Sequence, residues 1–352
     1  MAGRVFHGPL LSSVEGLELA AVLERNTDKA AERYPGITVY RALDDMLGDA
    51  SIGLFVVATP NGTHYEIAKR ILSAGRNVVV DKPIAMTSTE AADLTCLARE
   101  RKALLAPFHN RRWDSDFLTV QKLIHEGALG RLVAFESRFD RWRPALLTER
   151  LWKERAGSGG ILLDLGTHLA DQALVLFGLP QAISADVLRE KDGLDVSDSI
   201  TIRLRYPGEC NSGQHDRGLT VTLGANTLSL PAKPRYHLRG TRGGYLKFGV
   251  DPQEAALNKI VRIADPEWGQ EASSEWGVLH VDIDGSLVSR PIPSAVGDYR
   301  LYYAGIRDAL LGNAPAPVTG LDGWRVARLL EWAAESSERR CEIECDWSQE
   351  PK

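Results

Sequence analysis

The chain has few cysteines and no pattern that would join them. Four cysteines occur among 352 residues, and no two are spaced as Cys-x-x-Cys. Cys341 and Cys345 would lie about 13 Å apart on a strand, which is too far for a disulfide bond. We therefore predict that all four, including Cys96 and Cys210, are reduced structural thiols. No metal site is predicted, and metal binding by the cysteines is the alternative.

Long apolar runs and an excess of either charge are also missing. No stretch of about 18 apolar residues suggests a membrane span, and the first residues lack the apolar core of a secretory signal. Lys and Arg number 42 against 47 Asp and Glu, which gives a formal charge of −5. A nucleic-acid-binding protein would be expected to carry a basic patch. These absences predict a cytoplasmic protein with neither a membrane nor a nucleic-acid partner.

Through Pro107 the chain alternates apolar β segments with helical patterns. Strands are predicted at Leu17–Glu24, Thr38–Tyr40, Ile52–Ala58, Val78–Val80 and Ala103–Pro107. Helices are predicted at Thr27–Tyr34, at Ala42–Leu47, from the Thr63 region to Ala74, and at Thr89–Arg101. This alternation predicts a parallel sheet covered by helices on both faces.

Beyond Pro107 the predicted strands alternate apolar and polar residues, which is typical of an antiparallel sheet with one exposed face. These strands are Leu132–Phe139, Ala182–Leu188, Ser199–Tyr206, Leu219–Leu230, Tyr236–Leu238 and Tyr245–Phe248. Helices are predicted at Asp114–Glu126, Gly160–Leu176, Asp298–Leu311 and Leu321–Glu338, with a loose tail beyond Trp347. The chain length predicts roughly two domains.

The apolar strand Val78–Val80 ends at Asp81-Lys82-Pro83. Pro83 has no N–H and disfavours helix at Lys82, so the Lys82 side chain should project from the carboxyl end of the strand. Ligands of open α/β sheets bind at that end. An amine there could hydrogen-bond a substrate oxygen and stabilise charge that develops on it. A surface lysine beside a turn is the alternative, because most lysines are solvated.

The predicted helix after Gly160 is largely apolar but carries Asp164, His168 and Asp171 at i, i+4 and i+7. This spacing places all three on one stripe of the helix. A buried histidine beside a carboxylate can donate or accept a proton near neutral pH. In the alternative, Asp164 only complements the helix dipole and His168 is a core residue whose hydrogen bonds are satisfied.

The amino end lacks the expected opening of a dinucleotide-binding fold, which is a strand running into Gly-x-Gly-x-x-Gly. Ala2-Gly3 leads directly into Arg4–His7, a pattern typical of the first helix without its strand. Glu24 ends the next predicted strand, where an acidic residue could bond a ribose 2′-OH. Arg25 could instead attract a 2′-phosphate, and each residue could equally be a solvated charge.

Taken together, these motifs resemble the Gfo/Idh/MocA family of oxidoreductases, and they occur in the family's order over nearly the whole chain. The matching segments are Asp81-Lys82-Pro83, similar to the family's Glu-Lys-Pro; Thr59-Pro60-Asn61 with His64, similar to its fourth-strand turn; and Gly160–His168, similar to its catalytic helix. Phe108–Trp113 and Phe139–Pro144 resemble the branch that contains bacterial scyllo-inositol dehydrogenases.

The resemblance implies an α/β fold, with a Rossmann-type parallel sheet in a domain of residues 1–108 that binds NAD or NADP. Residues 109–347 would form an α+β domain for substrate binding and oligomerisation, with an open, mainly antiparallel sheet. The implied activity is hydride transfer between a CH–OH group of a sugar, inositol or related polyol and the cofactor. A homo-oligomer, either dimer or tetramer, is also implied.

The resemblance also implies residue roles. Lys82 would bond the substrate oxygen and stabilise alkoxide character, His168 would take the hydroxyl proton, and Asp164 would orient the substrate or His168. The implied cofactor contacts are Gly3, Glu24, Arg25, Thr59, Pro60, Asn61, His64, Asp81, Lys82 and Pro83. The weaker substrate-pocket candidates are Asn110, Arg111, Arg143 and Trp152.

One departure from the family is expected at the amino end, where the first strand and the first two motif glycines are not found. Ala2-Gly3 matches only the close of that loop, which predicts that Met1 is an internal methionine and that the chain is truncated. Two alternatives to the dehydrogenase therefore stay open. One is a non-catalytic regulator that senses a dinucleotide or sugar, since folds outlive their chemistry; the other is an inactive truncated product.

Overall fold

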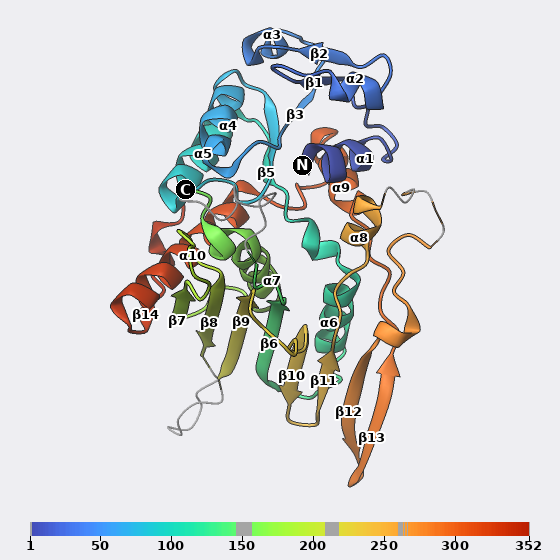
Figure 1. The fold of residues 1–352 in the computed structure, drawn as a ribbon, viewed down its shortest axis with the longest axis vertical. Coiled ribbons are helices and arrows are strands. Elements are labelled where there is room, and N and C mark those ends of the chain that lie inside the picture. Colours follow the sequence, from blue (N-terminus) through green and yellow to red (C-terminus); the bar gives the residue numbers. More distant parts are fainter. Residues whose placement is uncertain are drawn as a thin grey trace.

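The computed structural model describes residues 2–145, 157–207, 218–259, 263, 265 and 267–351. A region built on parallel strands lies at the top of the view in Figure 1, and a larger mixed sheet lies below it. The fold is therefore α/β, with a Rossmann-like parallel part followed by a mixed sheet, as the sequence predicts. None of the described helices is both long enough and apolar enough to span a bilayer.

The parallel part contains two ladders, and no ladder hydrogen bonds join them within the described residues. One ladder pairs β1 (Ala21–Leu23) with β2 (Thr38–Tyr40), and the other has the order β3 (Leu54–Val57), β4 (Asn77–Val80), β5 (Leu105–Pro107). The intervening helices are α2 (Lys29–Arg33), α3 (Leu43–Leu47), α4 (His64–Ser73) and α5 (Ser88–Arg101). The predicted β-α alternation is thus confirmed, although β1 is shorter than predicted.

The central strand β4 is buried on both faces, since Val78, Val79 and Val80 are each 0% exposed. Three consecutive β-branched residues therefore face the core without alternation, which is typical of a parallel strand. After β4 the chain turns into α5, whose N-cap Thr87 forms a reciprocal capping box with Glu90. The strand end that carries Lys82 is consequently held between a buried strand and a well-defined helix start.

The large sheet has nine strands in the order β13-β12-β11-β10-β6-β9-β8-β7-β14. Its strands are β6 (Leu132–Asp140), β7 (Ala182–Leu188), β8 (Ser199–Tyr206), β9 (Leu219–Asn226), β10 (Tyr236–Gly240), β11 (Gly243–Lys247), β12 (Gly277–Ile283), β13 (Ser286–Ile292) and β14 (Ile343–Glu344). Neighbouring strands are antiparallel except β6 and β9. One face packs into a core with residues such as Phe135, Ile202 and Val221, as the alternating pattern predicts.

Several elements of the large sheet differ from the sequence prediction. The β12–β13 hairpin turns at Asp284-Gly285, where both residues have positive φ, and this turn signal was missed. Strand β9 ends at Asn226 rather than Leu230. The tail beyond Trp347 is not loose, because Glu350 accepts from Arg325 Nε at 2.7 Å and the Pro351 oxygen accepts from Arg99 at 3.1 Å.

The carboxy-terminal helices return to the parallel part of the molecule. The α9 helix (Arg300–Leu310) shares a hydrophobic core with Val79, and α10 (Gly320–Arg339) shares another with Val78 and Val80. Figure 1 shows α10 between α5 and strand β7, and both contacts are made. Helices from the end of the chain therefore complete the amino-terminal cores, and the boundary between 108 and 109 stays a prediction.

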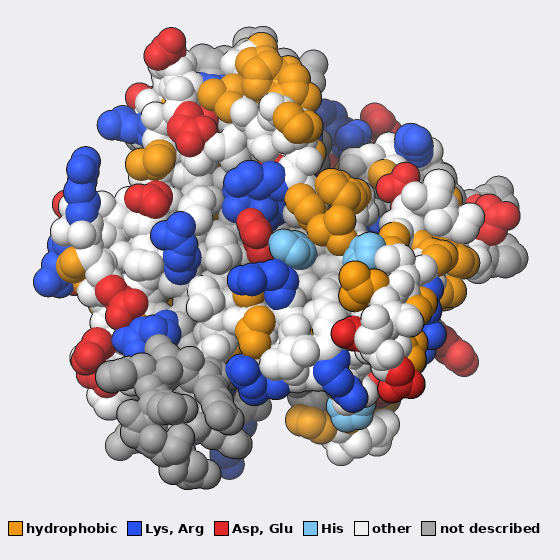
Figure 2. Space-filling model, turned by 90° about the horizontal axis from the view of Figure 1, so that it is seen from below, with side chains coloured by type: hydrophobic (Ala, Val, Ile, Leu, Met, Phe, Trp, Pro, Cys, Tyr) orange, Lys and Arg blue, Asp and Glu red, His pale blue; other side chains and the backbone are white. Residues whose placement is uncertain are grey.

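The surface carries both signs of charge. Acidic and basic side chains are interspersed over the face seen from below, where hydrophobic side chains gather in a few patches (Figure 2). A mixed surface of this kind does not produce a strong field of one sign.

Candidate active site

Lys82 reaches from the end of β4 to the helix that begins beyond Gly160. The backbone N–H of Asp81 donates to the Val57 carbonyl, which extends the ladder to the residue before Lys82. The Lys82 amine Nζ donates to Asp164 twice, to the backbone oxygen at 2.9 Å and to carboxylate Oδ1 at 2.6 Å. Two residues that are 82 positions apart in the sequence are therefore in direct contact, as the shared site requires.

The segment that carries Asp164 begins at a position that admits only glycine. Gly160 has a φ of +59°, and a Cβ there would lie 2.6 Å from the Ser197 backbone oxygen. The helix then starts as a π-helical turn, η5 (Leu162–Gly166), and continues as α7 (Thr167–Phe177). The sequence predicted one α-helix, but a π-helical turn contains Asp164 and ends two residues before His168. Such π-turns are frequent at functional sites.

His168 is 6% exposed, and its Nδ1 is buried with no hydrogen-bond partner among the described residues. Burial lowers the pKa of His168 well below its ordinary value of 6.5, and the charges of Lys82 and Arg111 lower it further. The imidazole is therefore neutral at pH 7 and can accept a proton. The charges of Lys82 and Arg111 therefore act on the His168 ring.

Asp171, the third residue of the predicted stripe, has a different environment. Its carboxylate accepts two hydrogen bonds from Arg112 Nε and a third from Arg112 Nη2 at 2.7 Å. Its Oδ1 also lies 4.0 Å from Nε2 of His109, a ring that is 1% exposed. Asp171 is thus engaged in a buried ion pair, while Asp164 contacts Lys82.

Arg111 and Glu254 form a second ion pair close to His168. The Arg111 guanidinium lies 5.0 Å above the Phe139 ring and donates Nη2 to Glu254 Oε2. Glu254 belongs to α8 (Gln253–Asn258), an element that sequence analysis missed. Burial raises the pKa of the Glu254 carboxyl, but nearby cations outweigh it and the net shift is downward. Glu254 is therefore ionised at neutral pH.

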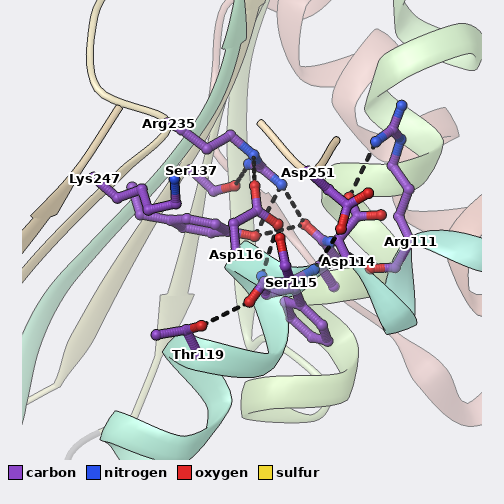
Figure 3. Close-up of polar contacts among 12 residues, drawn as sticks. Arg111, Asp114, Ser115, Asp116, Thr119, Ser137, Arg235, Lys247 and Asp251 are labelled. Carbon is purple, nitrogen blue, oxygen red and sulfur yellow. Dashed lines mark hydrogen bonds and ion pairs between the residues drawn. The ribbon is translucent and has the colours of Figure 1, made fainter. Parts of the chain in front are cut away.

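A network of buried polar side chains holds Arg111 in place (Figure 3). Arg111 Nη1 donates to Asp114 at 3.0 Å, and the Asp114 carboxylate also accepts from Tyr299. Gln172 Nε2 donates to the Arg111 backbone oxygen at 2.8 Å. The Gln172 amide oxygen in turn accepts from Arg235, so Arg111 is tied to the large sheet. Buried polar networks of this kind rigidify a site when every member has partners.

The Thr59–Asn61 turn lies beside Lys82 at the end of β3. Thr59 and Pro60 are exposed, and Asn61 Nδ2 donates to the Ser158 backbone oxygen at 3.1 Å. His64 is fully buried, with Nδ1 2.7 Å from the Pro83 oxygen and Nε2 2.8 Å from the Thr59 oxygen. The ring of His64 therefore fastens this turn to the segment after Lys82, and a direct cofactor contact by His64 stays a prediction.

Asp81 and His7 lie on the amino-terminal side of the site. Asp81 Oδ1 accepts from the backbone N–H of Lys82 at 2.9 Å and lies 4.0 Å from His7 Nε2. His7, which sequence analysis missed, is 2% exposed, and its Nδ1 lies 2.6 Å from the Tyr303 hydroxyl. Burial lowers the pKa of His7 although Asp81 opposes the shift. No sequence motif marks this histidine, because its partners come from the opposite end of the chain.

The remaining cofactor candidates lie further along the same edge. Gly3 begins a π-helical turn, η1 (Gly3–His7), and a Cβ on it would lie 3.7 Å from Ala58 at the end of β3. Glu24 follows β1, and its Oε2 accepts from the Ala30 N–H at 3.1 Å. Arg25 beside it is exposed. Glu24 and Arg25 follow the carboxyl end of β1, Gly3 lies near the residue that follows β3, and the roles of all three as cofactor contacts stay predictions.

The four weaker substrate candidates lie in different surroundings. Asn110 is buried at the start of η3 (Asn110–Trp113), the turn that also holds Arg111. Arg143 is half-buried, and its backbone N–H donates to the Thr227 oxygen. Trp152 lies outside the described residues. Arg111 is the candidate whose charge acts on His168.

A cavity of about 220 Å³ adjoins this site. Its wall includes Pro83, Leu163 and Thr167, which are the immediate chain neighbours of Lys82, Asp164 and His168. Half of the remaining lining residues belong to α10, and most of the remaining lining is apolar. Lys82, Asp164 and His168 are not themselves among the lining residues, so the cavity lies beside these three groups, between the segment after β4 and α10.

Comparison with known proteins assigns both parts of the chain. Residues 1–109 match the profile described as "Oxidoreductase family, NAD-binding Rossmann fold", and residues 117–246 match the GFO/IDH/MocA C-terminal domain. The uncharacterized oxidoreductase YdgJ of Escherichia coli is 38% identical, covering 97% of this chain and 95% of YdgJ. The scyllo-inositol 2-dehydrogenase (NADP(+)) IolW of Bacillus subtilis is 34% identical, covering 97% of this chain and 92% of IolW.

Solved structures agree with these matches. The structure of YvaA from Bacillus subtilis superposes with a TM-score of 0.91 at 34% identity, covering 98% of this chain and 95% of YvaA. An oxidoreductase from Bacillus cereus gives a TM-score of 0.85 at 28% identity, with 95% and 94% covered. The amino-terminal profile matches from residue 1, so it does not support the predicted truncation. The segment Gly3–Leu11 is a continuous helix within that match.

Proposed function

The chain belongs to the Gfo/Idh/MocA family of oxidoreductases, and we propose that it is a dehydrogenase that transfers hydride between a CH–OH group and NAD or NADP. The substrate class we propose is a sugar, an inositol or a related polyol. One relative supports this class, because IolW is named a scyllo-inositol 2-dehydrogenase. Its identity to this chain is 34%, so the individual substrate is a separate question.

The observation that carries the proposal is the meeting of three groups from two distant segments. An amine at the end of a parallel strand, Lys82, contacts Asp164, and His168 follows one turn later in the same helical segment. His168 is buried, neutral and within the electrostatic influence of Lys82. Oxidation of an alcohol requires a proton acceptor and a cation near the oxygen, and these are the groups assembled here.

Each group has a definite task in this proposal. Lys82 donates a hydrogen bond to the substrate oxygen and stabilises the negative charge that develops as the proton leaves. His168 accepts that proton, because its lowered pKa keeps the ring neutral at pH 7. Asp164 holds the Lys82 amine in place, and its contact at 2.6 Å shows how short that tether is. Each of these contributions is worth roughly 10²–10⁴ in rate.

The residues of this chain suit a nicotinamide cofactor at the same strand ends. The Thr59–Asn61 turn follows β3 and Lys82 follows the neighbouring strand β4, and polar groups at the carboxyl ends of parallel strands can recognise a ribose and a carboxamide. Nicotinamide, when bound, supplies the hydride acceptor, while the protein supplies orientation and electrostatics. Thr59, Pro60, Asn61, Asp81 and Pro83 would hold that end of the cofactor.

The experiment that tests the proposal is a substrate panel. Purified protein is mixed with NAD or NADP and with each of a series of sugars and inositols, and the reduced-nicotinamide absorbance is followed. We expect turnover with at least one polyol and loss of that turnover in Lys82→Met and His168→Gln. Cofactor binding without turnover of any polyol would contradict the dehydrogenase and favour a sensor. The cytoplasmic location and the homo-oligomeric state, dimer or tetramer, are further parts of this proposal.

A further inference from the structure

The start of the six-residue helix that carries Glu254 is held by several buried hydrogen bonds. Asp251 is 2% exposed, and its Oδ2 accepts from the Ser115 N–H at 2.7 Å. Gln253 is fully buried; its amide donates to the Trp113 oxygen and accepts from the Tyr299 N–H at 2.7 Å. Figure 3 shows Asp251 beside Ser115 and Asp114 in this network. Residues just before Glu254 are therefore fixed to η3, α6 (Ser115–His125) and α9.

Glu254 itself emerges from this network toward solvent. Its side chain is 40% exposed, whereas that of its partner Arg111 is 8% exposed. One carboxylate oxygen, Oε2, accepts from Arg111, and no hydrogen bond to Oε1 is recorded among the described residues. A fixed carboxylate with an outward oxygen is the geometry of a group that receives hydrogen bonds from a ligand.

Glu254 is connected to the candidate active site through Arg111: Arg111 Nη2 donates to Glu254, and the Arg111 backbone oxygen accepts from Gln172, which lies one helical turn after His168 in α7. Arg111, Arg141 and Lys82 each lower the pKa of the Glu254 carboxyl. The charges of Lys82 and Arg111 also act on His168. Glu254 therefore shares one electrostatic environment with the proposed proton acceptor. It is absent from the roles assigned above, because nothing in the hydride-transfer step requires a second carboxylate.

A carboxylate in this position discriminates between two kinds of substrate. Hydroxyl groups of a neutral polyol can donate to Glu254, because an ionised carboxylate only accepts hydrogen bonds. The carboxylate of a sugar acid cannot donate, and it would be repelled by the like charge. Without Glu254, the cations Lys82, Arg111 and Arg141 would instead attract such an acid. Specificity often depends on a repulsive element of this kind.

We propose that Glu254 is a specificity-determining residue, which binds hydroxyl groups of a neutral polyol and excludes sugar acids from the site. This inference rests on the dehydrogenase function proposed above. Glu254 acts on substrate choice and not on the proton or hydride that is transferred. Its loss should therefore change KM and the ratio between substrates more than it changes kcat.

Three variants separate the charge of Glu254 from its hydrogen bonds. Glu254→Gln keeps the size and removes the charge, while Glu254→Asp keeps the charge and withdraws the oxygens. Glu267→Gln removes an exposed carboxylate from another part of the carboxy-terminal half and serves as the matched control. The probes are matched pairs, D-glucose with D-glucuronate and D-galactose with D-galacturonate. Both kcat/KM and calorimetric dissociation constants are measured for each pair, with thermal unfolding as the check on folding.

We expect Glu254→Gln to raise the acid-to-neutral preference about 10- to 100-fold, the range of one charge-assisted hydrogen bond. Glu254→Asp should weaken neutral sugars while still rejecting the acids, and Glu267→Gln should match the wild type. An unchanged preference in Glu254→Gln would overturn the inference and leave Glu254 as a structural partner of Arg111. Acceptance of acids by Glu254→Asp would also overturn it.

The calorimetric arm separates this inference from the proposed function. If the wild type binds neutral sugars but turns none over, the dehydrogenase proposal fails while the selectivity of binding is still measured. If the wild type is active but Glu254→Gln keeps its selectivity, only the inference about Glu254 fails. A wild type that binds neither member of any pair contradicts the inference as well, because there is then no neutral selectivity for Glu254 to supply.

Discussion

The site has two sides, which we call its walls: one carries Lys82, and the other carries Arg111 and Glu254. The side chains of the two walls are positioned in different ways. Lys82 is positioned by the backbone: the β3–β4 ladder extends to Asp81, and Pro83 fixes the next peptide. Arg111 and Glu254 on the other wall are positioned by side chains, through the local pair Arg111–Asp114 and through contacts of Arg111 with the distant residues Glu254 and Gln172. The first wall should therefore tolerate loss of its functional side chain, whereas the second should lose stability when a supporting residue is removed.

The largest effect should come from the backbone-built wall. Lys82→Met removes the amine that contacts Asp164 and leaves the strand intact. We expect kcat/KM to fall by about 10³-fold or more, and the free energy of unfolding to change by about 1 kcal/mol or less, because the ion pair is partly exposed. The measurements are steady-state kinetics and urea unfolding. Lys69→Met, which removes an exposed lysine of α4, is the control and should keep full activity.

A loss of stability is instead expected when a buried ion pair of the network that supports Arg111 is broken. Arg235 is 3% exposed and pairs with Asp116, which is fully buried, at 3.1 Å. Arg235→Met leaves that carboxylate buried without its partner, so the free energy of unfolding should fall by about 3–5 kcal/mol. Urea unfolding provides the measurement.

The double variant Asp116→Leu/Arg235→Met removes both charges and should recover much of that stability. If Arg235→Met alone costs less than about 1 kcal/mol, the second wall does not depend on its buried pairs, and the contrast between the walls is wrong.

Acid should lower the stability of the protein, because the fold holds three buried histidines in their neutral form. Burial lowers the pKa of His7, His109 and His168 below 6.5. In the unfolded chain these rings take up protons below about pH 6.5, so stability is full above that pH and is lost as the pH falls. The slope should reach at most about 1.4 kcal/mol per pH unit for each histidine.

Urea unfolding between about pH 7.5 and about pH 5.5 measures this slope. His168→Gln should reduce it, since one of the three rings no longer titrates. A slope that is unchanged in His168→Gln would show that this ring is not held neutral by the fold.

The smallest effect is expected at the link between the Thr59–Asn61 turn and the segment that precedes Asp164. Asn61 Nδ2 donates to the Ser158 oxygen at 3.1 Å, across 97 residues of sequence. Asn61→Ala removes this hydrogen bond and should lower the free energy of unfolding by about 0.5–1.5 kcal/mol. Thr63→Ala, which affects a hydroxyl bonded within the same turn, is the comparison. Equal effects of the two variants would mean that the Asn61–Ser158 hydrogen bond adds no stability beyond that of the turn itself.

The same difference between the walls explains what the sequence could predict. Lys82 was found because three β-branched residues and a proline are local signals, and local signals set strand ends. Asp164 and His168 were found because helical spacing places them on one stripe, although the π-helical turn that contains Asp164 was not foreseen. The β12–β13 hairpin was missed, but Asp284-Gly285 between alternating residues is a signal that could have identified it.

Glu254 and the network beneath Arg111 could not be predicted in this way. The Arg111–Glu254 pair joins residues 143 positions apart, and the Arg235–Asp116 pair joins residues 119 positions apart. No local pattern in either segment marks a partner, because the pairing exists only after the large sheet has formed. Arg111 itself was named only as a weak substrate candidate, and its ion pairs with Asp114 and Glu254 were not foreseen.

The most direct test of the account is a crystal structure of the protein with nicotinamide cofactor and a polyol that the substrate panel identifies. The account predicts that Lys82 Nζ and a ring nitrogen of His168 both lie within about 3 Å of the same substrate oxygen. It also predicts that the carbon bearing this oxygen faces the nicotinamide ring. A polyol bound with Lys82 and His168 contacting different oxygens, or with neither in contact, would contradict it.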